Sequence, residues 1–565
     1  MTAKPLIECV PNFSEGRDMG IIKQITDAIE SVEGVKLLDV DPGKATNRTV
    51  VTFVGEPGPV VEAAFLGIRK AAELIDMRGH KGEHPRMGAT DVCPLIPIAN
   101  ISMEETARWA HQLAQRAGAE LGIPVFMYEA AATRPERKNL AIIRAGEYEG
   151  LAEKLKQSDW QPDYGPAAFN AGAGATVIGA RDFLVAYNVN LNTTSERRAN
   201  SVAFDVREQG RVKRKGDPIT GEIERDEQGE PIRIPGALKA VKAIGWYIAE
   251  YGIAQVSMNL TDINITSLHA AFEACCDSAH KRGMRVTGSE IVGMVPKKVL
   301  LDAGRHFLNK QERSLGVSEE ELIKIAVRSL GLDELSPFDP RKKVIEYQLE
   351  DAAGQRLVRM NLREFANETA SESVAPGGGS ISAYVGALAA SLGAMVANLS
   401  SHKRGWDEKW EFFSEWAERG QSLKDELLLL VDEDTRAFNA ILEAFRLPKE
   451  TDTEKAARKA AIQAATRYAI DVPFKVMERC SQIFPLLKAM VEEGNPNSIT
   501  DAAVGALCAR AALRGAMLNV QVNATGLHDK DYVAHILERC ASLQKAADAM
   551  EDEIIALSQQ KLSGS

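Results

Sequence analysis

The chain has 565 residues, of which 45% are hydrophobic and 26% are charged, and its formal net charge is -11. This composition is typical of a soluble globular protein, and the length exceeds what one hydrophobic core can hold, so three or four domains are expected. The acidic balance argues against sequence-independent nucleic-acid binding, which needs a basic surface, but a local basic pocket would suffice for an anionic substrate.

The cysteine pattern and the apolar segments predict a cytoplasmic protein. Seven cysteines are scattered along the chain without a C-x-x-C pair, which suits a reducing compartment and argues against a zinc ribbon. The N-terminus lacks the apolar core of a signal peptide. Residues 376–401 contain no charge, but they are mostly Ala, Gly and Ser. That composition favours the buried helix of a bundle over a membrane span.

The first third of the chain alternates between strand-like and helix-like periodicity. Such alternation predicts an α+β sandwich built on one sheet, and we assign it to residues 1–183. The predicted strands are residues 5–11, 35–41, 47–54, 92–98 and 124–128, and the predicted helices are residues 18–33, 57–76 and 102–121.

The pattern restarts near residue 183, which predicts a second, similar subdomain over residues 184–340 that faces the first. Residues 209–235 interrupt it with charges and turn formers, so the insertion at 213–235 is expected to be a surface hairpin. The predicted strands are residues 183–191, 254–260 and 284–290, and the predicted helices are residues 195–208 and 265–282.

The periodicity of the hydrophobic residues changes in the last part of the chain. Residues 336–343 read as a hinge, and residues 341–357 are expected to be a linker. Strand patterns end there, so residues 358–565 are predicted to form an all-α helical-bundle domain. Its predicted helices are residues 381–400, 407–446, 453–482, 499–518 and 530–561.

One stretch, residues 79–91, combines two histidines, a glutamate, an aspartate, two other cations and three glycines. An imidazole exchanges protons near neutral pH, and glycines let backbone approach a ligand closely. Arg86, Arg48 or Lys81 could hold an anionic substrate. Asp41, which ends a predicted strand, could fix the tautomer of a catalytic histidine, although an Asx-turn is an equal alternative.

A zinc site is the rival interpretation of this stretch. His80 to His84 fits the pattern H-x-x-E-H, with Glu83 between the histidines, and this pattern needs both histidines on one helical face. Gly82 lies inside that would-be helix, and Pro85 pushes the residue before it out of the α region. We therefore expect a catalytic loop and no metal.

The predicted bundle carries two polar motifs of its own. Gly377, Gly378, Gly379 and Ser380 precede a helix of small residues. Ser380 is a natural N-cap, and the free amides of such a loop attract an anion or a carbonyl group. Further on, residues 432–434 place three acids inside an apolar helix, and crowded carboxylates raise one another's pKa, so one could remain protonated as a general acid.

These motifs carry a family resemblance over nearly the whole chain. ECVPNFSEG at residues 8–16, GEHPRMGATDVCP at 82–94, APGGGS at 375–380 and DEDTRAF at 432–438 resemble the formimidoyltransferase-cyclodeaminase family. The resemblance implies ferredoxin-like α+β subdomains, His84 as the transferase catalytic residue, and a cyclodeaminase aspartate at Asp432 first or Asp434 second. It also implies a folate-binding segment, namely Gly165, Pro166, Ala167, Ala168, Phe169, Asn170, Ala171, Gly172, Ala173 and Gly174.

The expected function follows from the same resemblance. A bifunctional enzyme of histidine degradation would move a formimino group from N-formimino-L-glutamate to tetrahydrofolate and then release ammonia to leave 5,10-methenyltetrahydrofolate. The resemblance implies a polyglutamylated folate co-substrate, no metal, and a homo-oligomer built from dimers. The alternative is a folate-binding or scaffold protein with only one active half. The presence of His84 together with the acid pair argues against that alternative.

Overall fold

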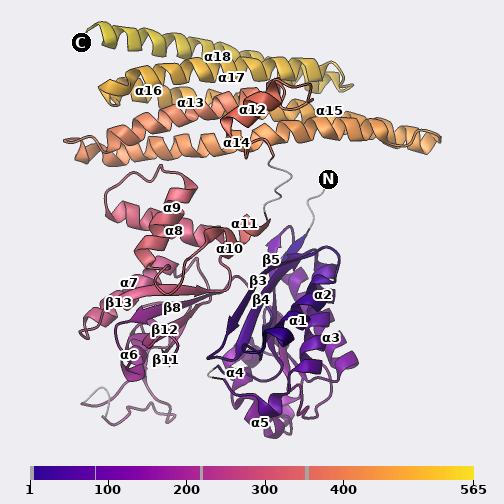
Figure 1. The fold of residues 1–565 in the computed structure, drawn as a ribbon, viewed down its shortest axis with the longest axis vertical. Coiled ribbons are helices and arrows are strands. Elements are labelled where there is room, and N and C mark those ends of the chain that lie inside the picture. Colours follow the sequence, from indigo (N-terminus) through magenta and orange to yellow (C-terminus); the bar gives the residue numbers. More distant parts are fainter. Residues whose placement is uncertain (1–4, 83, 217–220, 350–355, 565) are drawn as a thin grey trace. The chain divides into compact units, whose positions relative to one another are not determined.

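The computed structural model describes residues 5–82, 84–216, 221–349 and 356–564. It packs as two compact units, residues 1–303 with 326–349, and residues 304–325 with 350–565 (Figure 1). The first unit contains mixed sheets and helices, and the second is largely helical. The predicted multidomain order, an α+β part followed by an all-α part, is therefore confirmed.

The first unit begins with a seven-stranded sheet. Strands β1 and β2 lie between β4 and β5, β3 lies outside β4, and these contacts are antiparallel. Strands β5, β7 and β6 then follow in parallel. The strands are β1 (Leu6–Cys9), β2 (Asn12–Phe13), β3 (Val35–Gly43), β4 (Arg48–Gly55), β5 (Thr90–Ala99), β6 (Val125–Glu129) and β7 (Thr176–Ala180).

Helices cover one face of this sheet and leave the other open. They are α1 (Met19–Glu30), α2 (Pro57–Leu74) and α3 (Met103–Leu121) (Figure 1). Asp18 caps α1 by accepting hydrogen bonds from two backbone amides, and Ser102 with Glu105 forms a capping box on α3. Apolar residues at helical spacing, such as Ile22, Ile25 and Ile29, are buried.

A second, four-stranded sheet repeats this plan. Its order is β11–β12–β8–β13, all antiparallel, which matches the order β3–β4–β1–β5 in the first sheet. The chain order is strand, helix, two strands, helix and strand in both. The elements are β8 (Val185–Leu191), α6 (Glu196–Val206), β11 (Val241–Ile248), β12 (Ile253–Leu260), α7 (Leu268–His280) and β13 (Val286–Val292).

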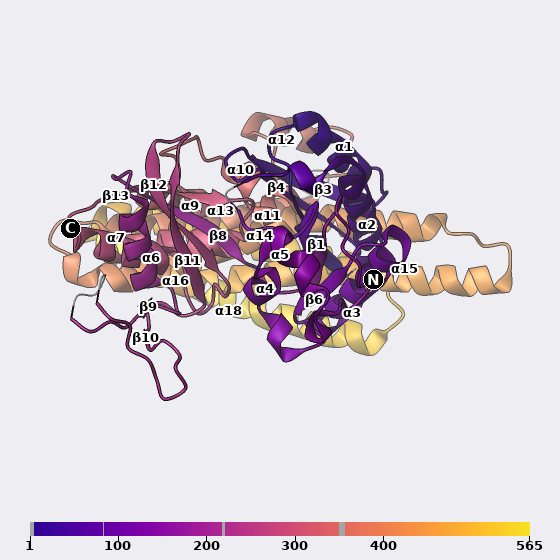
Figure 2. The same ribbon diagram turned by 90° about the horizontal axis from the view of Figure 1, so that it is seen from below.

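The charged insertion forms a hairpin, as the sequence predicts. Strands β9 (Arg211–Val212) and β10 (Arg233–Ile234) pair in antiparallel fashion, and the segment between them projects from the second sheet (Figure 2). Its residues 217–220 lie outside the described part of the chain.

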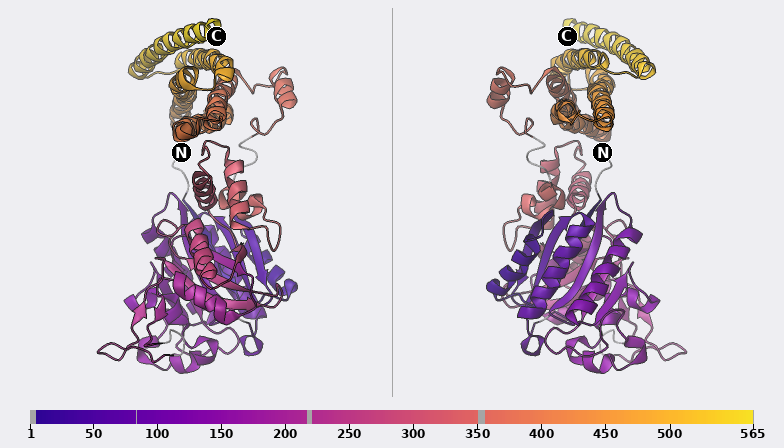
Figure 3. Two further views of the ribbon diagram at one scale, coloured as in Figure 1. Left: turned by 90° about the vertical axis from the view of Figure 1, so that its left-hand side faces the viewer. Right: turned by 90° about the vertical axis from the view of Figure 1, so that its right-hand side faces the viewer.

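The second unit is a bundle of long helices that lie side by side (Figure 3). Helix α13 packs against α14 and α17, and α15 packs against the same two helices. The helices are α12 (Leu362–Thr369), α13 (Gly378–Ser401), α14 (Trp410–Arg446), α15 (Asp452–Ser481), α16 (Ile483–Glu493), α17 (Ile499–Ala524) and α18 (Lys530–Ser563).

Small residues let α13 sit in the bundle core. Gly386 lies against Leu427 and Cys480, and Gly393 lies against Leu486. Both α13 and the segment 496–524 are long and apolar enough to cross a membrane, but 61% of the apolar window of α13 is buried inside the protein. This burial agrees with the predicted role of α13 as a core helix.

The expected linker, residues 341–357, begins with helical residues that are hydrogen-bonded to the first unit. Asp339 caps α10 (Pro340–Lys343). Val295 donates a backbone hydrogen bond to Lys343 and accepts one from Ile345, the first residue of α11 (Ile345–Leu349). Residues 350–355 lie outside the described part of the chain.

Residues 304–325, which interrupt the sequence of the first unit, belong to the second unit. The chain enters that unit within α8 (Lys297–Lys310) and leaves it within α9 (Glu319–Leu330). The connecting loop is held there because the Gly316 carbonyl accepts hydrogen bonds from Asn398 (2.7 Å) and Gln421 (3.1 Å).

Candidate active sites

A cleft of about 700 Å³ lies where both sheets of the first unit present their open faces. Side chains alternate between the two faces of a strand, so every second residue of a strand reaches it. From the first sheet these are Glu8, Val10, Arg48, Val50, Thr52, Val92, Pro94 and Ile96, and from the second they are Ala186, Asn188, Gln255, Ser257, Asn259, Glu290 and Val292.

Asn47 ties together the loops at one end of the cleft. Its side-chain oxygen accepts a hydrogen bond from the Gly16 amide (3.1 Å), and its side-chain nitrogen donates to the Lys81 carbonyl (3.1 Å). Its own carbonyl accepts from His80 Nε2 (2.9 Å), while Arg86 Nε donates to His80 Nδ1 (3.2 Å). Both ring nitrogens of His80 are thereby engaged in hydrogen bonds, which gives this side chain a structural role.

The two loops touch so closely that residue 82 has to be glycine. A Cβ atom on Gly82 would lie 2.2 Å from the Thr46 carbonyl oxygen, which is well inside van der Waals contact. Gly82 therefore sets the path by which the loop brings the following residues to the cleft.

His84 lines the cleft beside Arg48. Its Nδ1 donates to the Pro85 carbonyl (2.7 Å), and Arg48 Nη1 contacts both ring nitrogens, lying 2.7 Å from Nδ1. Burial, together with the positive charges of Arg48 and Arg144, holds the pKa of His84 well below its ordinary value. The ring is therefore neutral at physiological pH, with Nε2 free of a proton and able to accept one.

Two further arginines, which the sequence analysis does not predict as site residues, also line the cleft. Arg144, at the end of α4 (Leu140–Arg144), forms an ion pair with the fully buried Asp91. Lys154 in α5 (Glu147–Lys154) holds the end of α4 by donating to its carbonyls. Arg181 follows β7 directly. A polar residue directly after a strand is a signal for a site residue, but the sequence does not predict β7.

Arg86 does not present its charge to the cleft, contrary to expectation. It is buried and pairs with Glu147 (3.0 Å) and Glu149 (2.7 Å). Lys81 lines a separate small pocket with Arg86. Of the three cations proposed to hold a substrate, only Arg48 lines the cleft. Burial and the charge of Arg144 lower the pKa of Arg48 to about 9.

Asp41 lines the cleft but does not orient His84. It accepts a hydrogen bond from the Gly293 amide (2.9 Å) and lies 3.8 Å from Lys343 Nζ. The hydrogen bonds of His84 to described residues go to Arg48 and Pro85 instead. Glu83, the third residue of the zinc alternative, lies outside the described residues.

None of the residues in the segment Gly165–Gly174 lines the cleft. Its small residues serve close backbone packing, since a Cβ on Gly165 would lie 2.3 Å from the Ile123 carbonyl oxygen. Tyr148 donates to the Ala171 carbonyl (2.6 Å), and Phe169 packs against the Tyr148 ring. A role in folate binding remains a prediction for this segment.

The second candidate site lies at the start of α13. Gly377 is the N-cap residue, and Ser380, predicted to be the cap, is instead in the first turn. The reason is that its hydroxyl is used elsewhere, within hydrogen-bond distance of the Val431 carbonyl (2.9 Å) and Asp434 Oδ2 (3.0 Å). A Cβ on Gly379 would lie 2.1 Å from Asp434 Oδ1. The carboxyl of Asp434 thus rests on a glycine at a helix N-terminus.

The structure separates the two candidate acids. Burial raises the pKa of Asp434, although hydrogen bonds from Ser380 oppose the rise. Asp432 is buried as well, but its oxygens accept hydrogen bonds from the amides of Leu357 (2.8 Å) and Val358 (3.2 Å). The backbone thus engages Asp432, whereas Asp434 lies beside the start of α13. Which of the two acts as the cyclodeaminase acid stays a prediction.

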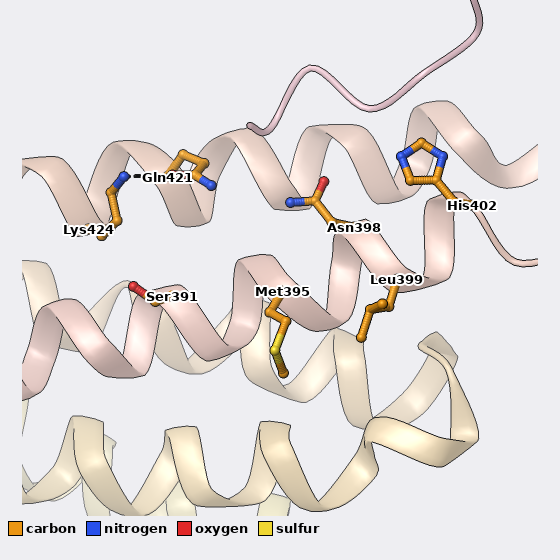
Figure 4. Close-up of a pocket in the computed structure, with 7 residues that line it drawn as sticks. All are labelled: Ser391, Met395, Asn398, Leu399, His402, Gln421 and Lys424. Carbon is orange, nitrogen blue, oxygen red and sulfur yellow. Dashed lines mark hydrogen bonds between the residues drawn. The ribbon is translucent and has the colours of Figure 1, made fainter. Parts of the chain in front are cut away.

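The bundle has another pocket, of about 500 Å³, toward the other end of α13. Figure 4 shows the side chains that surround it. They are Ser391, Met395, Asn398, Leu399, His402, Gln421 and Lys424.

Comparisons with known proteins match both units. Residues 6–181 match the formiminotransferase domain, N-terminal subdomain, residues 186–350 match the formiminotransferase domain, and residues 361–542 match the formiminotransferase-cyclodeaminase model. The chain is 44% identical over 543 residues to the formimidoyltransferase-cyclodeaminase of Rattus norvegicus, covering 96% of each chain. The chain belongs to the formimidoyltransferase-cyclodeaminase family.

Relatives of each half exist as separate proteins. The glutamate formimidoyltransferase of Thermoplasma acidophilum is 43% identical over 305 residues, which are 54% of this chain and 92% of that protein. The methenyltetrahydrofolate cyclohydrolase of Methylorubrum extorquens is 37% identical over 193 residues, which are 34% of this chain and 93% of that protein. The cleft with His84 thus lies in the formimidoyltransferase half, and Asp434 lies in the cyclodeaminase half.

Gly82→Val is expected to lower formimidoyl transfer strongly, because the new side chain must push the loop away from Thr46. A displacement of about 1 Å at a catalytic group can cost roughly 10²-fold in rate. Steady-state transferase assays on the folded protein would measure the loss. Gly79→Ala is the matched control, because a Cβ there meets nothing within 4 Å. Equal activity of both variants would contradict the role of the loop.

Proposed function

We propose that the protein transfers the formimino group of N-formimino-L-glutamate to tetrahydrofolate in the first unit. The second unit then converts 5-formiminotetrahydrofolate to 5,10-methenyltetrahydrofolate and ammonia, as a step of histidine degradation. One observation carries the proposal. Each half places a half-buried ionisable group at its candidate site: His84 lines the cleft beside Arg48, and Asp434 rests on Gly379 at the start of α13. The pKa of each group is shifted toward its neutral form, which suits His84 as a base and Asp434 as an acid.

In the transfer step, N5 of the folate attacks the amidine carbon of formiminoglutamate. The neutral His84 takes the N5 proton at Nε2, the atom that Arg48 approaches in the structure. The bond between the amidine carbon and the glutamate nitrogen then breaks, and that nitrogen receives the proton, so glutamate leaves as the free amine. Arg48, whose Nε has no hydrogen-bond partner among the described residues, would hold a substrate carboxylate.

In the cyclodeamination step, N10 attacks the formimino carbon and closes the five-membered ring. The departing nitrogen takes one proton from N10 and one from the protonated Asp434, and it leaves as ammonia. The product is the methenyl cation, and Asp434 becomes a carboxylate. The amides around Gly378 and Gly379 at the start of α13 would position the folate through an anionic or carbonyl oxygen.

The surroundings of these steps are part of the same proposal. The shared strand order of the two sheets supports ferredoxin-like subdomains. A polyglutamylated folate and a cytoplasmic location fit the reaction.

We propose a homo-oligomer built from dimers, because α13 and α17 pack together and expose apolar residues, which favours association. These residues are Leu388, Met395, Leu399, Val504, Leu507, Leu518 and Val522.

The low pKa of His84 predicts the pH dependence of transfer. A base works only when neutral, so the acidic limb of the kcat/KM profile is expected below pH ~6.5, the ordinary value for histidine. Arg48→Gln removes a positive charge and should move this limb upward while lowering the rate. Arg78→Gln, an exposed arginine paired with Asp76, is the control and should leave the limb in place. An unchanged limb in Arg48→Gln would contradict this assignment.

Asp432 and Asp434 should respond differently to replacement by asparagine. Asp434→Asn is expected to lower cyclodeamination of supplied 5-formiminotetrahydrofolate by about 10²- to 10⁴-fold at unchanged stability and unchanged transfer. Asp432→Asn should keep both activities but lower the free energy of unfolding by about 1–3 kcal/mol, because a backbone amide loses its acceptor. Denaturant unfolding and the two assays separate these outcomes. Loss of cyclodeamination in Asp432→Asn at wild-type stability would reverse the assignment.

A further inference from the structure

Glu8 is a buried carboxylate in the transferase cleft that the mechanism above does not use. It lies in β1 and is 3% exposed, yet its side chain lines the cleft. Within the described part of the chain, no hydrogen bond or ion pair reaches its oxygens. An unpaired carboxylate in such a place is costly, and burial raises the pKa of Glu8 to about 7, although the charge of Arg181 opposes the rise. A ligand with hydrogen-bond donors would remove this cost.

Glu8 lies too far along the sheet to act on the atom that His84 contacts. Its partner on the neighbouring strand β4 is Val54. Arg48, which contacts His84, is the first residue of β4 and lies six residues before Val54. At ~3.3 Å per residue that separates the backbones by about 20 Å, a distance that the long side chains and the ligand between them can span. Glu8 therefore faces a different edge of the same ligand.

The walls around Glu8 suit a flat ring. Val10, Pro94 and Ile96 line the cleft from the same face of the sheet. Tyr128 is 2% exposed and also lines it. Burial raises the pKa of Tyr128 to about 12, so it remains a neutral phenol. Apolar walls beside a carboxylate suit a planar heterocycle whose adjacent N–H donors face that carboxylate.

We propose that Glu8 binds the pyrimidine edge of the pterin ring of tetrahydrofolate. Its two oxygens accept hydrogen bonds from N3–H and from the exocyclic 2-amino group, in the bidentate manner of a carboxylate facing two parallel donors. This contact fixes the ring so that N5 points toward His84. The inference rests on the proposed transferase function and adds the residue that recognises the pterin.

The test uses the full-length protein with Glu8→Gln. An amide offers one acceptor and one donor, so the KM for tetrahydrofolate is expected to rise roughly 10- to 100-fold, the range for a lost hydrogen bond to a charged group. The KM for formiminoglutamate and the cyclodeamination of supplied 5-formiminotetrahydrofolate should not change. The melting temperature should equal or exceed that of the wild type, because an unpaired buried charge is removed. Glu250→Gln, an exposed carboxylate that lines the same cleft, is the matched control.

A second arm needs no variant. A tetrahydrofolate analogue that lacks the 2-amino group should bind wild-type protein roughly 10- to 100-fold more weakly, and Glu8→Gln should discriminate less between the two folates. Equal use of both folates by the wild type would overturn the proposal, as would a KM rise for formiminoglutamate instead, or a loss of stability in Glu8→Gln. Absence of any transfer by the wild type would instead refute the proposed function itself.

Discussion

The hydrogen bonds of Asn47 are the constraint on which the transferase cleft depends. One asparagine joins the loop after β2, the loop before β4 and the loop that carries His84. Its backbone is left-handed, with φ at 47°, a conformation that asparagine tolerates better than most residues. The close contact at Gly82 and the two hydrogen bonds of the His80 ring belong to the same junction. The charged groups of the cleft are thus positioned by polar contacts between loops, on a scaffold of two rigid sheets.

Burial lowers the pKa of His84 in the first half of the protein and raises the pKa of Asp434 in the second. Burial next to arginines keeps His84 neutral, so that it can accept a proton. In the second half, burial raises the pKa of Asp434, whose carboxyl rests on Gly379 at the start of α13, and this shift favours the protonated form that can donate a proton. The first reaction must deprotonate a weakly acidic amine, and the second must protonate a poor leaving group. The direction of each pKa shift therefore matches the step that its half performs.

Much of this could be predicted from the sequence, because the signals were local. Helical periodicity located α13, α14 and α15, and the loop around His84 was visible from its residue types. Strand β7 was missed because its five residues are all buried and include Gly179, so no alternation appears. The partners of Arg86 and Asp432 were out of reach for a different reason. Glu149 lies 63 residues from Arg86, and Leu357 lies 75 residues from Asp432, so only the fold shows which charges are already engaged.

Mixing two single variants tests the division of labour most directly. His84→Ala and Asp434→Asn would each be given formiminoglutamate and tetrahydrofolate, with the methenyl-folate absorbance and ammonia measured together. Neither variant alone should form both products, and the mixture should form them in equal amounts, because the first reaction's product can diffuse from one protein to the other. An inactive mixture beside an active wild type, or both products from one variant alone, would contradict the assignment of one reaction to each half.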